Sequence, residues 1–194
     1  MNFDSWQVLR DGSGPIVDPE SYLDRWVGDL VAHRLVGNTA AVAGFCAGNA
    51  FAIEMVHRIA TTGGSRPALV MFDPEPVDVV TLCHQYRLAV DRMAHELGRR
   101  VASEPDVTHT MATPLSEVAA DLSRRYEDAV RRTLDALGVE ADLGVELVGH
   151  FDRYLDYLCA ASRLGLPRSQ TAAQVSVPAV RRVPRGSVAP SRSY

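Results

Sequence analysis

Cys46 is the residue whose neighbours most clearly equip it for chemistry. It stands in Gly44-Phe45-Cys46-Ala47-Gly48, with a glycine two positions before it and two positions after it. This is the Gly-x-Ser-x-Gly pattern of a nucleophile elbow with cysteine in place of serine, in which a sharp strand-to-helix turn holds the nucleophile in a strained backbone conformation. The pattern makes Cys46 a candidate nucleophile for acyl transfer and the Ala47 N–H a candidate oxyanion-hole donor. An ordinary turn with a buried free cysteine is the alternative.

The residues around Cys46 predict the elements that such a turn requires. A short apolar run over 39–45 is typical of a buried strand, and helical spacing of apolar residues follows over 47–61. A side chain at either flanking glycine is expected to collide with this strand or helix. A second buried strand is predicted over 67–72 and ends at Asp73. Because a β-α-β unit gives parallel strands whose carboxyl ends share one edge of the sheet, we expect Cys46 and Asp73 to lie at that edge together.

Helical periodicity dominates the rest of a chain that is predicted to form one domain, 1–194. Asp18 is a predicted N-cap, with a proline at the first helical position. Short strands are predicted over 6–9 and 175–180, and the Pro/Ser/Arg-rich tail 184–194 has the composition of a disordered segment. The predicted helices cover roughly 19–35, 77–102, 115–137 and 143–165.

Composition narrows the class of protein. A net charge of −4 predicts no general affinity for nucleic acid, and no apolar run reaches the length of a membrane span. The N-terminus has neither the basic region nor the apolar region of a signal peptide. Three cysteines at wide spacings form neither a disulfide framework nor a zinc pattern, so reduced thiols in the cytoplasm are expected.

Residues 43–76 resemble the α/β-hydrolase thioesterases of polyketide and nonribosomal peptide assembly lines. The resemblance implies a reduced α/β-hydrolase-like fold, in which a parallel sheet with flanking helices carries a large helical lid over 77–165. It also implies that Cys46 is the nucleophile and that Asp73, which ends the strand after the elbow, is the triad acid. The matching text is Ala43-Gly-Phe-Cys-Ala-Gly, then Ala50-Phe-Ala-Ile-Glu-Met-Val-His-Arg-Ile-Ala, then Ala68-Leu-Val-Met-Phe-Asp-Pro-Glu-Pro.

The residue that would act as the general base of this expected triad is not determined by the resemblance. The family takes its catalytic histidine from a Gly-His pair after a last strand, and this chain looks like a member shortened at both ends. Gly149-His150 is the one Gly-His pair in the sequence, so His150 is the first candidate. His84 and His109 lie in the predicted lid region and are the alternatives.

The resemblance implies a function in natural-product biosynthesis. The expected reaction is acyl transfer, cyclisation or hydrolysis on a thioester carried by the phosphopantetheine arm of an acyl or peptidyl carrier protein, with no cofactor of the chain's own. The alternative is a non-catalytic relative that binds a carrier protein or a partner enzyme. The family has several strands before the elbow and this chain has room for one, so a homodimer or heteromer is expected to complete the sheet.

Overall fold

The computed structural model of the protein describes residues 18–63, 65–96, 109–138 and 141–166. Helices and strands are mixed in this part of the chain, which places the fold in the α/β class predicted from the sequence. The elements in chain order are α1 (Pro19–Ala32), the short 3-10 helix η1 (Val36–Asn38), β1 (Ala41–Phe45), α2 (Gly48–Gly63), β2 (Ala68–Phe72), α3 (Val79–Glu96), α4 (Leu115–Leu137) and α5 (Ala141–Leu164).

β1, α2 and β2 form the predicted β-α-β unit. The two strands pair in parallel, and their register runs from Ala41 opposite Ala68 to Phe45 opposite Phe72. α2 connects them and packs against both. Both strands lie within the predicted ranges, because a short apolar run between turn residues leaves little choice of position.

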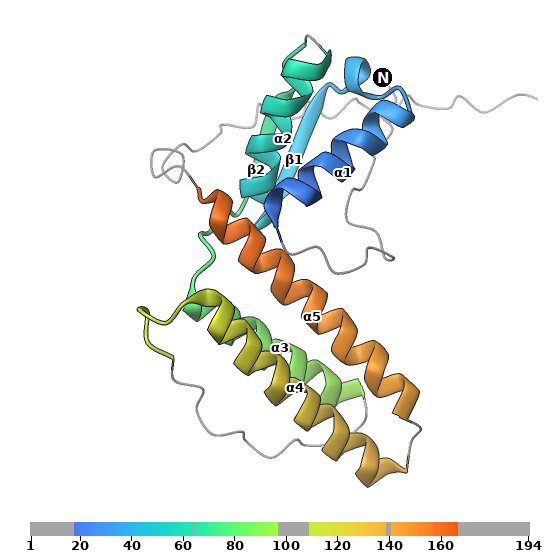
Figure 1. The fold of residues 1–194 in the computed structure, drawn as a ribbon, viewed down its shortest axis with the longest axis vertical. Helices are drawn as coiled ribbons and strands as arrows, with labels where there is room; N and C mark the ends of the chain where they lie inside the picture. The colour runs from blue at the N-terminus through green and yellow to red at the C-terminus, as the bar shows by residue number, and fades with distance from the viewer. Residues whose placement is uncertain (1–17, 64, 97–108, 139–140, 167–194) are drawn as a thin grey trace, which may run out of the picture.

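The three longest helices, α3, α4 and α5, pack together next to this unit. Figure 1 shows the strands with α1 and α2 at one end of the molecule and α3 and α4 at the other, with α5 in contact with both groups. Aromatic rings join the helices, as where Tyr126 of α4 meets Phe151 of α5 with ring centroids 4.4 Å apart. Fully buried side chains from all five α-helices make one continuous core: Leu23, Ile59, Leu82, Tyr86, Leu122, Leu155 and Leu158 are examples.

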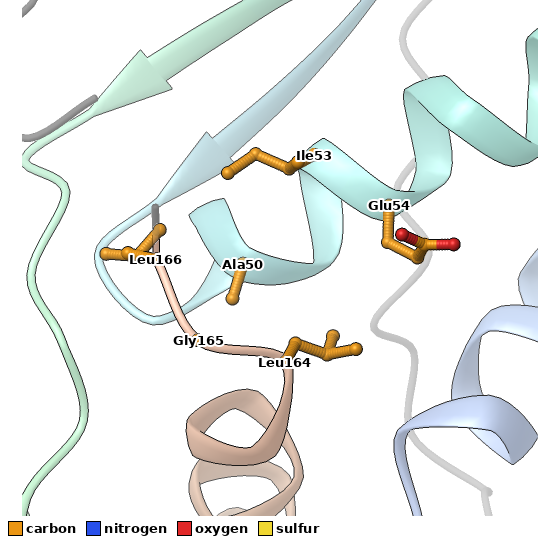
Figure 2. Close-up of a pocket in the computed structure, with 6 residues that line it drawn as sticks. All are labelled: Ala50, Ile53, Glu54, Leu164, Gly165 and Leu166. Atoms are coloured by element: carbon orange, nitrogen blue, oxygen red, sulfur yellow. The ribbon is translucent and has the colours of Figure 1, made fainter. Parts of the chain in front are cut away.

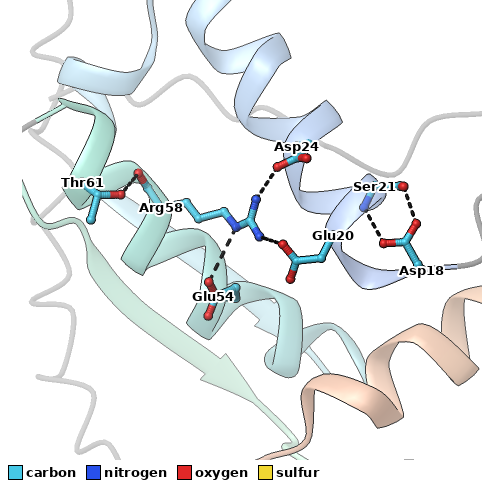
Figure 3. A network of polar contacts seen from close by, with 7 residues as sticks. All are labelled: Asp18, Glu20, Ser21, Asp24, Glu54, Arg58 and Thr61. Carbon is cyan, nitrogen blue, oxygen red and sulfur yellow. Dashed lines mark hydrogen bonds and ion pairs between the residues drawn. The ribbon is translucent and has the colours of Figure 1, made fainter.

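Arg58 of α2 connects α1 to the β-α-β unit (Figure 3). Its guanidinium forms ion pairs with Glu20 and Asp24 of α1 and lies 3.6 Å from Glu54 on its own helix. α1 itself begins as the sequence predicts, because Asp18 accepts a hydrogen bond of 3.1 Å from the backbone N–H of Ser21. This N-cap satisfies one of the donors that a helix start leaves free.

The described residues between 77 and 165 are largely helical, as predicted, and supply α3, α4 and α5. The predicted strands 6–9 and 175–180 and the tail 184–194 lie outside the described residues, as does the end of the predicted helix 77–102. Within the described part of the chain, no helix combines the length and the apolar character that crossing a membrane requires.

Candidate active site

Cys46 occupies a strained turn between β1 and α2. Its φ is +48°, in the left-handed region that residues with a side chain rarely adopt, and its side chain is partly exposed. α2 begins two residues later, so the backbone N–H groups of Ala47 and Gly48 stand at a helix N-terminus. Neither N–H has a backbone acceptor among the described residues. The turn thus presents a thiol beside donors that can hold a developing negative charge.

The two flanking glycines leave room for different neighbours. A Cβ on Gly44 would lie 2.7 Å from the Cα of Asn49 and 2.9 Å from the Cβ of Ala52, so β1 and α2 approach too closely for any side chain. A Cβ on Gly48 would lie 3.1 Å from the hydroxyl oxygen of Tyr157 on α5. The expected collision with α2 is therefore present at Gly44, whereas Gly48 makes space for a tyrosine of a distant helix.

Asn49 connects the Cys46 turn to the end of β2. Its side chain is fully buried, and its Nδ2 donates to the carbonyl oxygens of Cys46 at 2.7 Å and Phe72 at 2.9 Å. The Cys46 N–H donates to the same Phe72 carbonyl at 3.0 Å. Sequence reasoning missed this role, although a polar residue on the sheet-facing side of an otherwise apolar helix was a usable signal.

Asp73 lies where the sequence predicts, directly after β2 and exposed. Because Phe45 pairs with Phe72, Cys46 and Asp73 follow paired positions at the carboxyl edge of the sheet. Asp73 also has a positive φ, +46°, so both strands end in the same unusual backbone conformation. The shared edge expected for the nucleophile and the acid is therefore present.

The three candidate histidines have other neighbours. His150 is exposed on α5, with its Nε2 3.9 Å from Glu146 on the same helix. The Nε2 of His109 lies 3.2 Å from the carboxylate of Asp121 on α4, and His84 is exposed on α3. Within the described residues, none of the three is hydrogen-bonded to Cys46 or Asp73.

Two tyrosines of α5 stand beside Cys46 instead. The ring of Tyr157 stacks on Phe51 of α2 with centroids 5.0 Å apart and meets Tyr22 of α1 edge-on at 6.0 Å. The ring of Tyr154 lies nearly parallel to that of Tyr157, with centroids 6.4 Å apart. Burial raises the pKa of Tyr157 well above its ordinary value, and nearby charge on Tyr154 and Cys46 acts in the same direction. Burial likewise raises the pKa of Tyr154, again with a contribution from Cys46. Both hydroxyls therefore remain protonated donors at neutral pH.

Sequence reasoning missed both tyrosines. Their spacing of three residues on a predicted helix was visible, but such a pair is more often part of a core than of a site. No cluster of three or more histidine, cysteine, aspartate or glutamate side chains in the described ranges is placed to hold a metal ion. No protein-family model matches this chain, and no curated protein does. The proposed function therefore rests on Cys46 and the residues around it.

Proposed function

We propose that Cys46 accepts an acyl group from a thioester, as in the thioesterase-like acyl transfer of natural-product biosynthesis. The observation that carries the proposal is the strained backbone of Cys46 at φ +48°, between a parallel strand and the N-terminus of α2. Strain of this kind concentrates at functional sites, and here it occurs at a cysteine directly before two N–H groups that have no backbone acceptor among the described residues. The proposed donor substrate is an acyl group on the phosphopantetheine arm of an acyl or peptidyl carrier protein.

The chemical step is a thiol–thioester exchange. The Cys46 thiolate attacks the carbonyl carbon of the thioester, and the N–H groups of Ala47 and Gly48 hold the oxyanion that forms. When the tetrahedral intermediate collapses, the bond to the carrier sulfur breaks and the carrier thiolate takes up a proton from solvent. The acyl group now forms a thioester with Cys46 and passes to water or to another nucleophile.

Tyr157 supplies a further donor in this proposal. Its hydroxyl oxygen lies next to Gly48, beside the helix start that would hold the oxyanion, and its ring is fixed by Phe51 and Tyr22. A donor that is already in place when charge develops stabilises a transition state without reorganisation. In this proposal the hydroxyl of Tyr157 is an oxyanion-hole donor in addition to the two backbone N–H groups.

The positions of the histidines favour transfer over hydrolysis. Exchange between two thioesters is close to balanced in energy, whereas attack by water needs a base to activate it. None of the three candidate histidines is hydrogen-bonded to Cys46 or Asp73 within the described ranges. The acyl-Cys46 thioester is therefore expected to accumulate until an acceptor arrives.

The same observation favours a second candidate function. A chain that keeps the elbow without a base beside it could bind an acylated carrier protein or a partner enzyme without chemistry. In that case Asp73 has no histidine to orient and Cys46 is a remnant of the elbow.

Intact mass spectrometry separates the two functions. The full chain is incubated with an acyl-N-acetylcysteamine thioester, and one added acyl group that maps to Cys46 supports acyl transfer. Cys46→Ala should abolish the adduct, and Cys159→Ala is the matched control because this thiol is also partly exposed. Absence of an adduct, together with binding to an acylated carrier protein that Cys46→Ala leaves intact, would instead establish the binding function.

A further inference from the structure

One face of the two-stranded sheet is not covered by any described element. The strands contact each other and α2, and no other element of the described ranges. The side chains that point away from α2 are all apolar, and Phe45 and Phe72 remain 69% and 51% exposed. We call this surface the uncovered sheet face; it consists of Ala41, Ala43, Phe45, Ala68, Val70 and Phe72.

The uncovered sheet face has the composition of an interior surface. Parallel strands are found with both faces covered, because their side chains are apolar on both sides. Phe45 and Phe72 are direct cross-strand partners, so their exposed rings form one continuous apolar patch. An exposed apolar patch on a folded protein marks an interaction surface.

The described chain ends beside the β-α-β unit. Leu164, the last residue of α5, and the two residues after it, Gly165 and Leu166, line a cavity of about 260 Å³ against Ala50, Ile53 and Glu54 of α2. Figure 2 shows Leu166 beside the turn that joins β1 to α2. Leu166, the last described residue, therefore lies near the carboxyl edge of the sheet, the edge at which Phe45 and Phe72 end their strands.

We propose that residues 167–194 of the same chain cover the uncovered sheet face, through the apolar stretch 172–183. The five residues 167–171 can span about 17 Å, roughly the length of a five-residue strand, so the stretch reaches the face easily. It brings seven alanine and valine side chains to the six apolar side chains of the face. Burial of both surfaces drives the contact.

Charge complementarity supports the same occupant. Residues 167–194 contain five of the chain's 20 basic residues and none of its 24 acidic ones. The rest of the chain is therefore strongly acidic, and it places Asp73 and Glu75 directly after β2, at the edge of the face. A basic segment is attracted to that edge.

Tethering favours this segment over a second copy of the chain. A segment joined by a short flexible linker has an effective concentration of about millimolar at its target. A second copy at micromolar concentration offers the same kind of apolar surface at a thousandfold lower concentration. The proposal is independent of any catalytic role of Cys46.

Photo-cross-linking of the full chain tests the proposal. p-Benzoylphenylalanine replaces Phe45, and the matched control places it at Val145, which is 74% exposed near the start of α5. We expect position 45 to give cross-links within one chain that map to 167–194, at least tenfold more than position 145 gives. Their yield should be the same at 1 and 50 µM protein.

Tail variants check that the apolar stretch makes the contact. Val175→Asp with Val177→Asp should remove the cross-link from position 45, while Ser187→Asp with Ser191→Asp, beyond the stretch, should retain it. A covalent dimer would show instead that a second copy covers the face. Cross-links from position 45 to another segment of the chain, or only to another protein added to the sample, would also overturn the proposal. The absence of any cross-link from position 45 would overturn it as well.

Discussion

The side-chain amide of Asn49 donates to the backbone carbonyl of Phe72 at 2.9 Å and so joins the nucleophile turn to the neighbouring strand. The same nitrogen donates to the Cys46 carbonyl at 2.7 Å. One buried side chain therefore holds together the two strand ends at which the candidate nucleophile and the candidate acid lie. Its other polar atom, Oδ1, is buried and has no hydrogen-bond partner among the described residues.

Asn49→Ala should destabilise the fold by about 1–3 kcal/mol, because buried carbonyl groups lose a donor. The expected result is a lower midpoint of urea unfolding with an unchanged slope, measured by circular dichroism. Asn49→Asp should cost more, since a carboxylate would face two carbonyl oxygens. Asn38→Ala is the matched control, because Asn38 is an exposed residue of η1. An equal effect of Asn38→Ala and Asn49→Ala would contradict the role of Asn49.

Gly44→Ala and Gly28→Ala should shift stability in opposite directions. At Gly44 the new methyl group would lie 2.7 Å from the Cα of Asn49, so β1 and α2 must separate, at a cost of about 1–3 kcal/mol. Gly28 lies within α1 with nothing within 4 Å of its Cβ position, so alanine should stabilise the helix by about 0.8–1 kcal/mol. Thermal unfolding of the two variants measures both effects, and a tolerated Gly44→Ala would show that β1 and α2 do not pack as described.

Tyr157→Phe should slow acylation of Cys46 by about tenfold to a hundredfold while leaving the fold intact, because the ring contacts remain and one donor is lost. Single-turnover acylation by an acyl-N-acetylcysteamine thioester, followed by intact mass, gives the rate. Tyr126→Phe removes a buried hydroxyl on α4 and should leave this rate unchanged. A normal rate in Tyr157→Phe, in a protein that still forms the adduct, would remove Tyr157 from the mechanism without touching the role of Cys46.

Stability should fall with acid partly through Asp121. Burial acts to raise the pKa of this carboxyl, but the hydrogen bond from Arg125 and the charges of Arg125 and Arg124 outweigh it, so the pKa is lowered. A lowered pKa in the folded state gives stability that is present above the unfolded pKa of about 4 and is lost as pH falls below it. Asp121→Asn should therefore reduce the loss of stability between pH 5 and pH 2, by on the order of 1 kcal/mol.

Urea unfolding at several pH values measures this difference. Asp128→Asn on the same helix is the control, because Asp128 pairs with Arg131 at a more exposed position than that of Asp121. If wild type and Asp121→Asn lose stability in parallel, the ion pairs of Asp121 do not contribute to acid sensitivity.

The local sequence predicts the turn at Cys46, but it does not predict which side chains of other helices lie beside that turn. The strand, the turn at Cys46 and the start of α2 follow from a few adjacent residues, and Asp73 follows from the next strand in the chain. His150 and Tyr157 stand on one helix two turns apart, and only its packing decides which of them reaches α2. The Gly-His pair pointed to His150, whereas Tyr157 is the residue beside Gly48. Contacts between segments a hundred residues apart leave no such local trace.

The turn at position 46 is held by hydrogen bonds to its backbone and by the close approach of β1 and α2. The missing Cβ of Gly44, the amide of Asn49 and the carbonyl of Phe72 fix the backbone, and the two hydrogen bonds go to the carbonyl and the N–H of Cys46. A serine at this position would adopt the same backbone conformation, so the reacting atom can change without a change in the surrounding structure. A single substitution in evolution could therefore exchange sulfur for oxygen at position 46.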